Sequence, residues 1–425
     1  MTVAQRREPR ALEGFVRYLG GFEHLHWLFS QSGPRAFAHA IEVEGTTTVQ
    51  QWRTALDALQ RSQPLFSVQI DVDEAQRPYF RRVEGESISM RIVDGGRCAS
   101  WETELGRELA TKVAADHAPL LRAVLIHGAG RSTFILVAHH SISDGVSMTE
   151  ALSDLIRALS GESLEPRDVL PSTENLLGVR STAPPVPAEP SGARRINFTT
   201  SYVEPFSIAS RILDAELTDG LRRRAREERT TVHGVLCAAA IQAARGQSPE
   251  WERRTVRLLS PIDARKQCGV SNTSSMCIGA AIIPVPAEAD RDPWRLARHI
   301  KAEHAGPTSR AGLAAALGMI SDAVANVADV DGALDFVDPV FAYEVGVSNI
   351  GAVPGIGGYP AVRLTSMWGP ANLLGCDGEQ LVGATTFSGR LHLLHTAYSP
   401  LSGLLESIEA ALRQMCDRKG ADTRI

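Results

Sequence analysis

The sequence predicts an α/β protein of two domains, and three observations lead to this fold class. The chain has 425 residues, more than one hydrophobic core usually supports. Strand-like and helix-like apolar patterns are mixed in both halves. Between the halves, residues 181–194 (STAPPVPAEPSGAR) contain four prolines and no apolar periodicity, which is typical of a linker. We therefore expect one domain over residues 1–180 and another over residues 195–425.

Apolar periodicity in the first half predicts three strands and two helices. The strands are expected over residues 35–44, 119–126 and 133–138, and the helices over residues 49–59 and 146–158. The last two strands are joined by a short segment that contains glycine, so they are expected to form a hairpin.

The second half repeats this mixture of strands and helices. Residues 231–244 are apolar nearly all round and predict a buried helix, and residues 400–414 predict a closing amphipathic helix. Strands are expected over residues 255–261, 278–285, 342–347, 380–387 and 390–398. Ser388 and Gly389 separate the last two strands and predict a hairpin turn. The similar length and composition of the halves are consistent with two copies of one fold.

Composition and charge exclude several classes of function. The chain is 44% hydrophobic and 22% charged, with a formal net charge of −5, as in an ordinary globular protein. No basic tract points to nucleic acid, and no apolar stretch reaches the roughly 18 residues of a membrane span. The N-terminal segment lacks the hydrophobic run of a secretory signal. Six scattered cysteines show no metal-site spacing, so we expect reduced thiols, no metal and a cytoplasmic protein.

The most specific pattern in the chain is HHSISDG, residues 139–145. It follows the apolar strand at 133–138 and precedes the helix at 146–158. Because side chains alternate along a strand, only one of the adjacent histidines faces a given cavity. A single neutral imidazole aimed at a substrate is what a general base requires. The alternative is a pair of buried histidines satisfied by backbone groups, with Asp144 only capping the helix.

This motif resembles that of the superfamily that includes chloramphenicol acetyltransferase and the condensation domains of nonribosomal peptide synthetases. The supporting segments are APLLRAVLIHG (118–128), TTVHGVLCAAAIQAA (230–244), SPIDARKQCG (260–269) and VSNIG (347–351). The family's second signature, Asp-Phe-Gly-Trp-Gly, has no clean counterpart, because Asp335-Phe336 lacks the glycines and Met367-Trp368-Gly369 lacks Asp-Phe. The chain therefore most resembles the stand-alone, polyketide-associated acyltransferases.

The resemblance implies two similar mixed-sheet domains set in a V around a central tunnel. It also implies that an acyl group moves from a phosphopantetheine thioester, on coenzyme A or an acyl carrier protein, to a hydroxyl of a natural product or lipid. One alternative is a free-standing condensation enzyme that forms an amide on an amine acceptor. Another is a non-catalytic module that docks carrier proteins, which the intact His-His and Asp-Gly pairs disfavour. We expect a monomer with no permanently bound cofactor, since the thioester donor is a substrate.

The resemblance also suggests roles for the residues of the motif. His140 is expected to be the general base, and His139 to face the protein interior. Asp144 is expected to form a salt bridge that holds the loop, with Arg265 as its partner; the alternative for Arg265 is an exposed surface charge. Gly145 lets the backbone turn and approach the substrate, and its amide at a helix N-terminus is a candidate oxyanion donor.

Two further residues are candidates for the tunnel wall. They are Asn349 and Trp368, for which a turn-forming asparagine and a core tryptophan are the alternatives. Ser141 and Ser143 lack the Gly-x-Ser-x-Gly surroundings of a nucleophile elbow, so we do not expect covalent catalysis.

Overall fold

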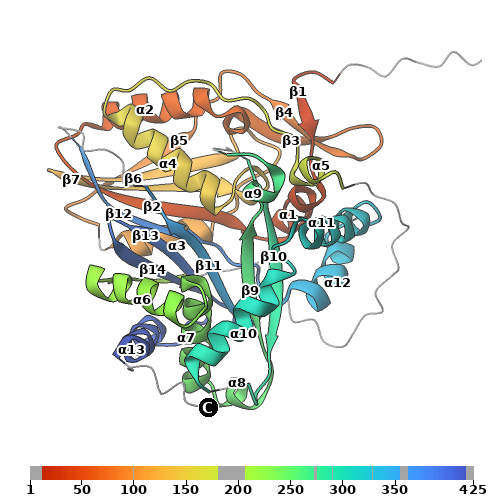
Figure 1. Cartoon of the computed structure of the whole chain (residues 1–425). Coiled ribbons are helices and arrows are strands. Elements are labelled where there is room, and N and C mark those ends of the chain that lie inside the picture. Colours follow the sequence, from red (N-terminus) through yellow and green to blue (C-terminus); the bar gives the residue numbers. More distant parts are fainter. Residues whose placement is uncertain are drawn as a thin grey trace, which may run out of the picture.

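The computed structural model describes residues 12–98, 100–179, 206–271, 275–289, 291–327, 329–354 and 362–417. In this part of the chain it contains sheets of five, six and three strands with helices packed on them (Figure 1). The predicted α/β class with mixed sheets is confirmed. The expected linker over residues 181–194 lies outside the described residues, so the domain boundary stays a prediction.

The first half contains the following elements in chain order. They are β1 Phe15–Tyr18, α1 Gly21–Ser32, β2 Ala36–Glu44, α2 Val49–Ser62, η1 Pro64–Ser67, β3 Val68–Val72, β4 Pro78–Arg82, β5 Ser89–Asp94, α3 Trp101–Leu109, β6 Leu121–Gly128, β7 Arg131–His139, η2 His140–Ile142, α4 Gly145–Leu159 and α5 Thr173–Leu177. Strands β6 and β7 pair antiparallel, which confirms the predicted hairpin.

The five-stranded sheet has the order β12-β2-β7-β6-β5. Helices α2 and α4 pack against one another over this sheet (Figure 1). The apolar side chains Trp52 and Leu56 of α2 and Leu152 of α4 share one buried cluster with Phe134 of β7. The apolar periodicity of residues 49–59 and 146–158 therefore marks the faces that cover the sheet.

The second half contains the remaining elements. They are β8 Ser207–Leu213, α6 Ala215–Glu227, α7 Val232–Gln247, α8 Pro249–Arg253, β9 Val256–Asp263, α9 Arg265–Cys268, β10 Ile278–Val285, α10 Pro293–Ala305, α11 Arg310–Val324, α12 Val330–Phe341, β11 Val345–Ala352, β12 Arg363–Ala371, β13 Gln380–Phe387, β14 Arg390–Ala397 and α13 Leu404–Asp417.

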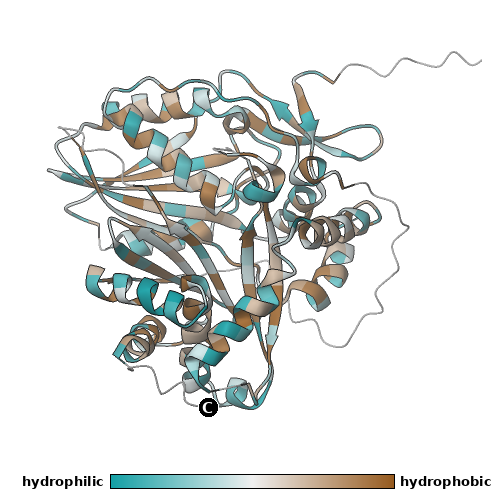
Figure 2. Ribbon diagram, in the orientation of Figure 1, coloured by the Kyte–Doolittle hydropathy of each residue, from teal (hydrophilic) through white to brown (hydrophobic). Residues whose placement is uncertain are grey.

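The six-stranded sheet has the order β10-β9-β11-β13-β14-β8. Helix α7 packs against β9 and β11 on one side and against α10 and α13 on the other, which explains why its sequence is apolar nearly all round. Hydrophilic residues gather instead on outer helices such as α6 (Figure 2). Ser388 and Gly389 have φ values of 48° and 75°, as the two central residues of a tight hairpin turn between β13 and β14 require.

Strand β12 joins the two halves of the molecule. It comes from the second half of the chain but pairs antiparallel with β2 of the first half, with Met367 opposite Ile41. It also contacts β13 and β14 of the six-stranded sheet. The apolar periodicity of the sequence does not predict this strand. Its pairing joins two segments more than 300 residues apart, which local patterns do not reveal.

Two further elements bring the halves together beside the HHSISDG segment. Strands β9 and β10 form an antiparallel arm that reaches toward the first half and carries α9 at its end (Figure 1). Helix α1 contacts α11 and α12 on one side and η2 on the other. None of the described helices has the length and apolar character that crossing a membrane requires.

Candidate active site

The two histidines of HHSISDG lie where a central strand ends. Strand β7 runs between β2 and β6, and its last residue, His139, pairs with Ala36. The 3-10 turn η2 begins at His140 and ends the strand's alternation. Asp144 then caps α4, since its side chain accepts a hydrogen bond from the Ser147 N–H at 2.9 Å. The chain is therefore fixed on both sides of His140 by regular structure.

Hydrogen bonding fixes the tautomer of His140. Its Nδ1 lies 2.9 Å from the carbonyl oxygen of Ser143. Because a carbonyl only accepts, Nδ1 carries the proton and Nε2 keeps its lone pair. His140 lines a cavity, and its Nε2 has no hydrogen-bond partner among the described residues. This is the arrangement that a general base needs.

Burial keeps the His140 imidazole neutral. The side chain is only 7% exposed, and its ring lies against those of His26 and Phe37, with centroid distances of 4.2 Å and 4.4 Å. Burial lowers the pKa of His140 below its ordinary value of 6.5, although Asp144 and the Ser143 carbonyl oppose this effect. The proton-accepting form therefore predominates at neutral pH.

This lowered pKa predicts the pH dependence of turnover. With an alcohol acceptor, which does not titrate, kcat/KM should hold its plateau down through pH ~6.5 and fall only at lower pH, as His140 becomes protonated. Steady-state rates across pH test this, with circular dichroism at each pH to show that the protein is folded. A half-maximal rate at or above pH ~6.5 would contradict the assignment.

His139 faces the protein interior. It is 2% exposed, and its Nδ1 accepts a hydrogen bond from the Ser141 N–H at 3.2 Å. Burial and the neighbouring His140 lower its pKa to about 3, so it stays neutral. His139 does not line the cavity. The two histidines differ in environment because His139 ends strand β7, whereas His140 begins the 3-10 turn.

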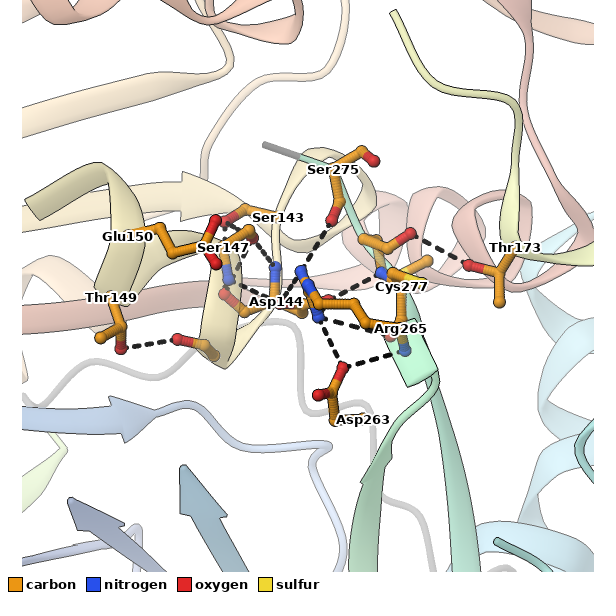
Figure 3. A network of polar contacts seen from close by, with 12 residues as sticks. Ser143, Asp144, Ser147, Thr149, Glu150, Thr173, Asp263, Arg265, Ser275 and Cys277 are labelled. Atoms are coloured by element: carbon orange, nitrogen blue, oxygen red, sulfur yellow. Dashed lines mark hydrogen bonds and ion pairs between the residues drawn. The ribbon is translucent and has the colours of Figure 1, made fainter. Parts of the chain in front are cut away.

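Asp144 and Arg265 form a buried ion pair that connects the two halves (Figure 3). The two Arg265 Nη atoms donate to the two carboxylate oxygens at 3.0 Å and 3.1 Å. The Cys277 N–H also donates to Asp144, at 2.7 Å, so the first residue of α9 and the residue before β10 are both attached to the N-cap of α4. Asp144 is 0% and Arg265 5% exposed. The pair therefore fixes the end of the arm against the motif loop.

The charges of this pair stabilise one another despite their burial. Burial alone would raise the pKa of Asp144, but the charge and donors of Arg265 outweigh it and lower that pKa below its ordinary value. Burial likewise opposes the charge of Arg265, and Asp144 reverses this and raises its pKa. Arg265 also contacts Asp263 at 2.9 Å and the Ser275 carbonyl at 3.3 Å. The Asp144 carboxylate and the Arg265 guanidinium therefore both stay charged near neutral pH, and their ion pair connects the two segments.

Gly145 allows the close approach of another segment to the first turn of α4. Its φ lies outside the left-handed region, so the backbone angle does not require glycine. A Cβ at this position would lie 2.3 Å from Cδ1 of Ile350 in β11. Amides of a first helical turn have no partner within the helix, and those of Gly145 and Val146 lie at residues that line the cavity. Neither amide has a hydrogen-bond partner among the described residues, so both remain candidate donors to an oxygen that gains negative charge.

The cavity lies between the two halves of the protein. Its volume is about 120 Å³, somewhat less than the ~150 Å³ of a cavity known to hold benzene. The wall is mostly apolar and comes from α1, β2, η2, α4, β9, β10, β11, β13, the end of α12 with the segment that follows it, and the segment after β12. Its polar members are His26, His140, Asp263, Tyr343, Ser348, Asn349 and Asn372. A small apolar group with one reacting polar end suits this space.

The structure places Asn349 and Trp368 differently. Asn349 lines the cavity, and its side-chain oxygen accepts a hydrogen bond from the Gly351 N–H at 2.9 Å, so it also orders a bulge in β11. Trp368 does not line this cavity. It is 3% exposed, stacks on Trp101 and donates to Glu42 at 3.0 Å within a separate part of the core. The structure therefore places Asn349 in the wall of the cavity that His140 also lines, and it places Trp368 outside that wall.

Helix α1 supplies the wall residues that the sequence interpretation missed. Phe22, Leu25, His26 and Phe29 all line the cavity from this one helix. Their spacing of i, i+3, i+4 and i+7 is the signal that marks one helical face. The glycine pair at residues 20–21, just before them, also marks the helix start.

Comparison with known proteins gives one sequence match and many matches in structure. Residues 204–393 match the sequence model of a family described as "Phthiocerol/phthiodiolone dimycocerosyl transferase C-terminus". No curated protein matches the chain significantly in sequence. The sequence match falls on the half of the chain that supplies Arg265 and Asn349.

Three solved structures illustrate the likeness in fold. Polyketide synthase associated protein 5 from Mycobacterium tuberculosis has a TM-score of 0.66 and 16% identity, covering 96% of this chain and all (100%) of that one. The first condensation domain of the CDA synthetase has a TM-score of 0.64 and 16% identity, covering 95% and 97% of the two chains. Trichothecene 15-O-acetyltransferase from Fusarium sporotrichioides has a TM-score of 0.62 and 11% identity, covering 98% and 99%. At these identities the likeness establishes a shared fold.

Proposed function

We propose that the chain is a member of the acyltransferase superfamily of condensation domains and chloramphenicol acetyltransferase, near its polyketide-associated members, and that it transfers an acyl group from a thioester to a hydroxyl. The sequence match over residues 204–393 and the shared fold support this proposal. The observation that carries this proposal is His140. Its Nε2, which has no hydrogen-bond partner among the described residues, belongs to a neutral imidazole, and that imidazole lines a cavity built from both halves of the protein.

The proposed reaction has no covalent enzyme intermediate. As the acceptor oxygen attacks the thioester carbonyl carbon, His140 Nε2 takes the hydroxyl proton and a C–O bond forms. The carbonyl oxygen becomes an oxyanion, for which the Gly145 amide is a proposed donor. The intermediate then collapses, the C–S bond breaks, and the His140 imidazolium returns the proton to the departing thiolate. The products are an ester and a free thiol, and the enzyme is unchanged.

We propose a phosphopantetheine thioester as donor, carried by coenzyme A or by an acyl carrier protein. Two substrates would enter from opposite faces of a tunnel between the lobes, as the resemblance implies. A mostly apolar wall would keep out water that otherwise hydrolyses the thioester, so the lining of this cavity supports transfer over hydrolysis. We also propose a cytoplasmic setting, which the six unpaired cysteines support.

A transfer assay tests the function. Acetyl-, butanoyl-, benzoyl- and octanoyl-coenzyme A are each incubated with octanol, benzyl alcohol, octylamine or benzylamine, and the products are identified by mass spectrometry. Ester formation that depends on the enzyme supports the proposal. Amides with no esters would favour the condensation enzyme instead. The absence of any transfer product, with these donors or with the same acyl groups on a carrier protein, would count against acyl transfer.

We also predict that the acyl-coenzyme A donors do not acylate the enzyme itself. Ser141 and Ser143 are fully buried and do not line the cavity, and the Ser141 hydroxyl donates to the Glu23 carbonyl at 2.7 Å. Burial also raises the pKa of the Cys277 thiol, which makes it a poor nucleophile. Intact-protein mass spectrometry with donor and no acceptor should therefore show no adduct, and kinetics with both substrates should be sequential. A stoichiometric acyl adduct that reacts on with acceptor would overturn the mechanism.

A further inference from the structure

A second imidazole lies against the proposed base. His26, on the cavity face of α1, stacks on the His140 ring with a centroid distance of 4.2 Å and an interplanar angle of 28°. Phe22 and Phe29 of the same helix lie 5.0 Å and 6.3 Å from the His26 ring. Helix α1 is in turn packed between η2 and the helices α11 and α12. His26 is therefore held in place beside His140 by the fold.

Neither ring nitrogen of His26 has a hydrogen-bond partner in the part of the chain that the structure describes. Among the described residues, His26 forms no hydrogen bond and no ion pair, whereas His140 Nδ1 is tied to the Ser143 carbonyl. A neutral imidazole always carries one N–H donor and one lone-pair acceptor. The cavity wall thus presents one N–H beside the base with no acceptor in the described part of the protein.

His26 is unsuited to act as a second base. Burial lowers its pKa well below the ordinary 6.5, and the neighbouring His140 and His139 lower it further. During the proposed reaction His140 gains a positive charge 4.2 Å away, which opposes a second proton even more strongly. The His26 N–H can still act as a hydrogen-bond donor, and a donor stabilises an oxygen that becomes negative during the reaction.

We propose that His26 is a catalytic residue whose imidazole N–H donates a hydrogen bond to the thioester carbonyl oxygen as it becomes an oxyanion. This inference rests on the proposed function and deepens it, because it supplies a second donor besides the Gly145 amide. Such a bond strengthens as charge develops on the oxygen, so its main effect is on the transition state.

The alternative is that His26 only supports the His140 ring by stacking. His26→Phe separates the two roles, because phenylalanine keeps an aromatic ring on the α1 face but has no N–H. If His26 donates to the oxyanion, His26→Phe should lower kcat by on the order of 10²-fold. The KM values for donor and acceptor should change by less than about threefold, since the bond is made chiefly in the transition state.

Thermal stability gives the first control. His26→Phe removes from a mostly apolar wall two nitrogens that have no partner among the described residues, so its Tm should equal or exceed that of the wild type. The second control is His24→Phe, because His24 lies on another face of the same helix, beside Trp27, and does not line this cavity. It should keep the wild-type kcat. His26→Asn and His26→Gln each restore an N–H donor, on a shorter and a longer side chain. The kcat of at least one of them should be about tenfold higher than that of His26→Phe.

Three results would overturn the inference. They are a His26→Phe enzyme with kcat within about threefold of the wild type, a rise in KM with kcat unchanged, and no recovery in either amide variant. If His26→Phe fails to fold, His26→Ala serves as the variant without an N–H donor. A higher kcat in His26→Asn or His26→Gln than in His26→Ala then supports the inference, and an equal kcat overturns it. Wild-type enzyme is measured in the same assay, so a failure of acyl transfer itself is distinguished from a failure of the His26 role.

Discussion

Replacing His140 by alanine is expected to lower kcat by roughly 10²–10⁴-fold, the range typical of a lost general base. The physical reason is that the acceptor proton then has no nearby group to receive it while the C–O bond forms. Affinity for the donor should change little, because His140 contributes one reacting nitrogen to a largely apolar wall. The measurement is kcat with saturating donor and acceptor, together with donor affinity by calorimetry.

His139→Ala is the matched control for this prediction. His139 is adjacent in sequence but buried in the interior, so its removal should lower the Tm and leave the kcat of the folded fraction near that of the wild type. A His140→Ala enzyme that keeps activity within about threefold of the wild type would refute the assignment of the base. So would a His139→Ala enzyme that folds normally and shows the larger loss of kcat.

Replacing Asp144 by alanine is expected to lower the free energy of unfolding by about 3–5 kcal/mol. The substitution leaves the buried Arg265 guanidinium without the carboxylate that accepts two of its hydrogen bonds, and it removes the cap of α4. Urea denaturation measures the loss. Because the pair connects the arm to the motif loop, activity should fall as well.

Arg265→Ala should show a similar loss of stability, and the double variant should lose much less than the sum of the two. Asp263→Ala is the control on the same arginine: the Asp263 side chain is 48% exposed, so its ion pair should contribute no more than about 1 kcal/mol. An Asp144→Ala protein with unchanged urea midpoint, or strictly additive losses in the double variant, would contradict the structural role of the pair.

Much of the local structure follows from the sequence alone. The strands expected over 278–285 and 380–387 have the bounds of β10 and β13, and the hairpin of β6 and β7 lies where its two apolar runs predict. The apolar runs before and after the HHSISDG segment likewise predict that a strand ends and a helix begins around His140. These features depend on side-chain periodicity and turn residues within a few positions of one another, so a single sequence contains the information.

The tertiary structure decided the rest of the candidate site. Asp144 and Arg265 are 121 residues apart in sequence, and their pairing depends on how the β9–β10 arm packs against α4. His26 reaches His140 only because α1 packs against η2, and Trp368 lies away from the cavity because β12 crosses to the first sheet. The tautomer of His140 likewise depends on where the Ser143 carbonyl lies after the turn. Periodicity determines which face of an element is buried, whereas the packing of distant elements determines which side chains meet.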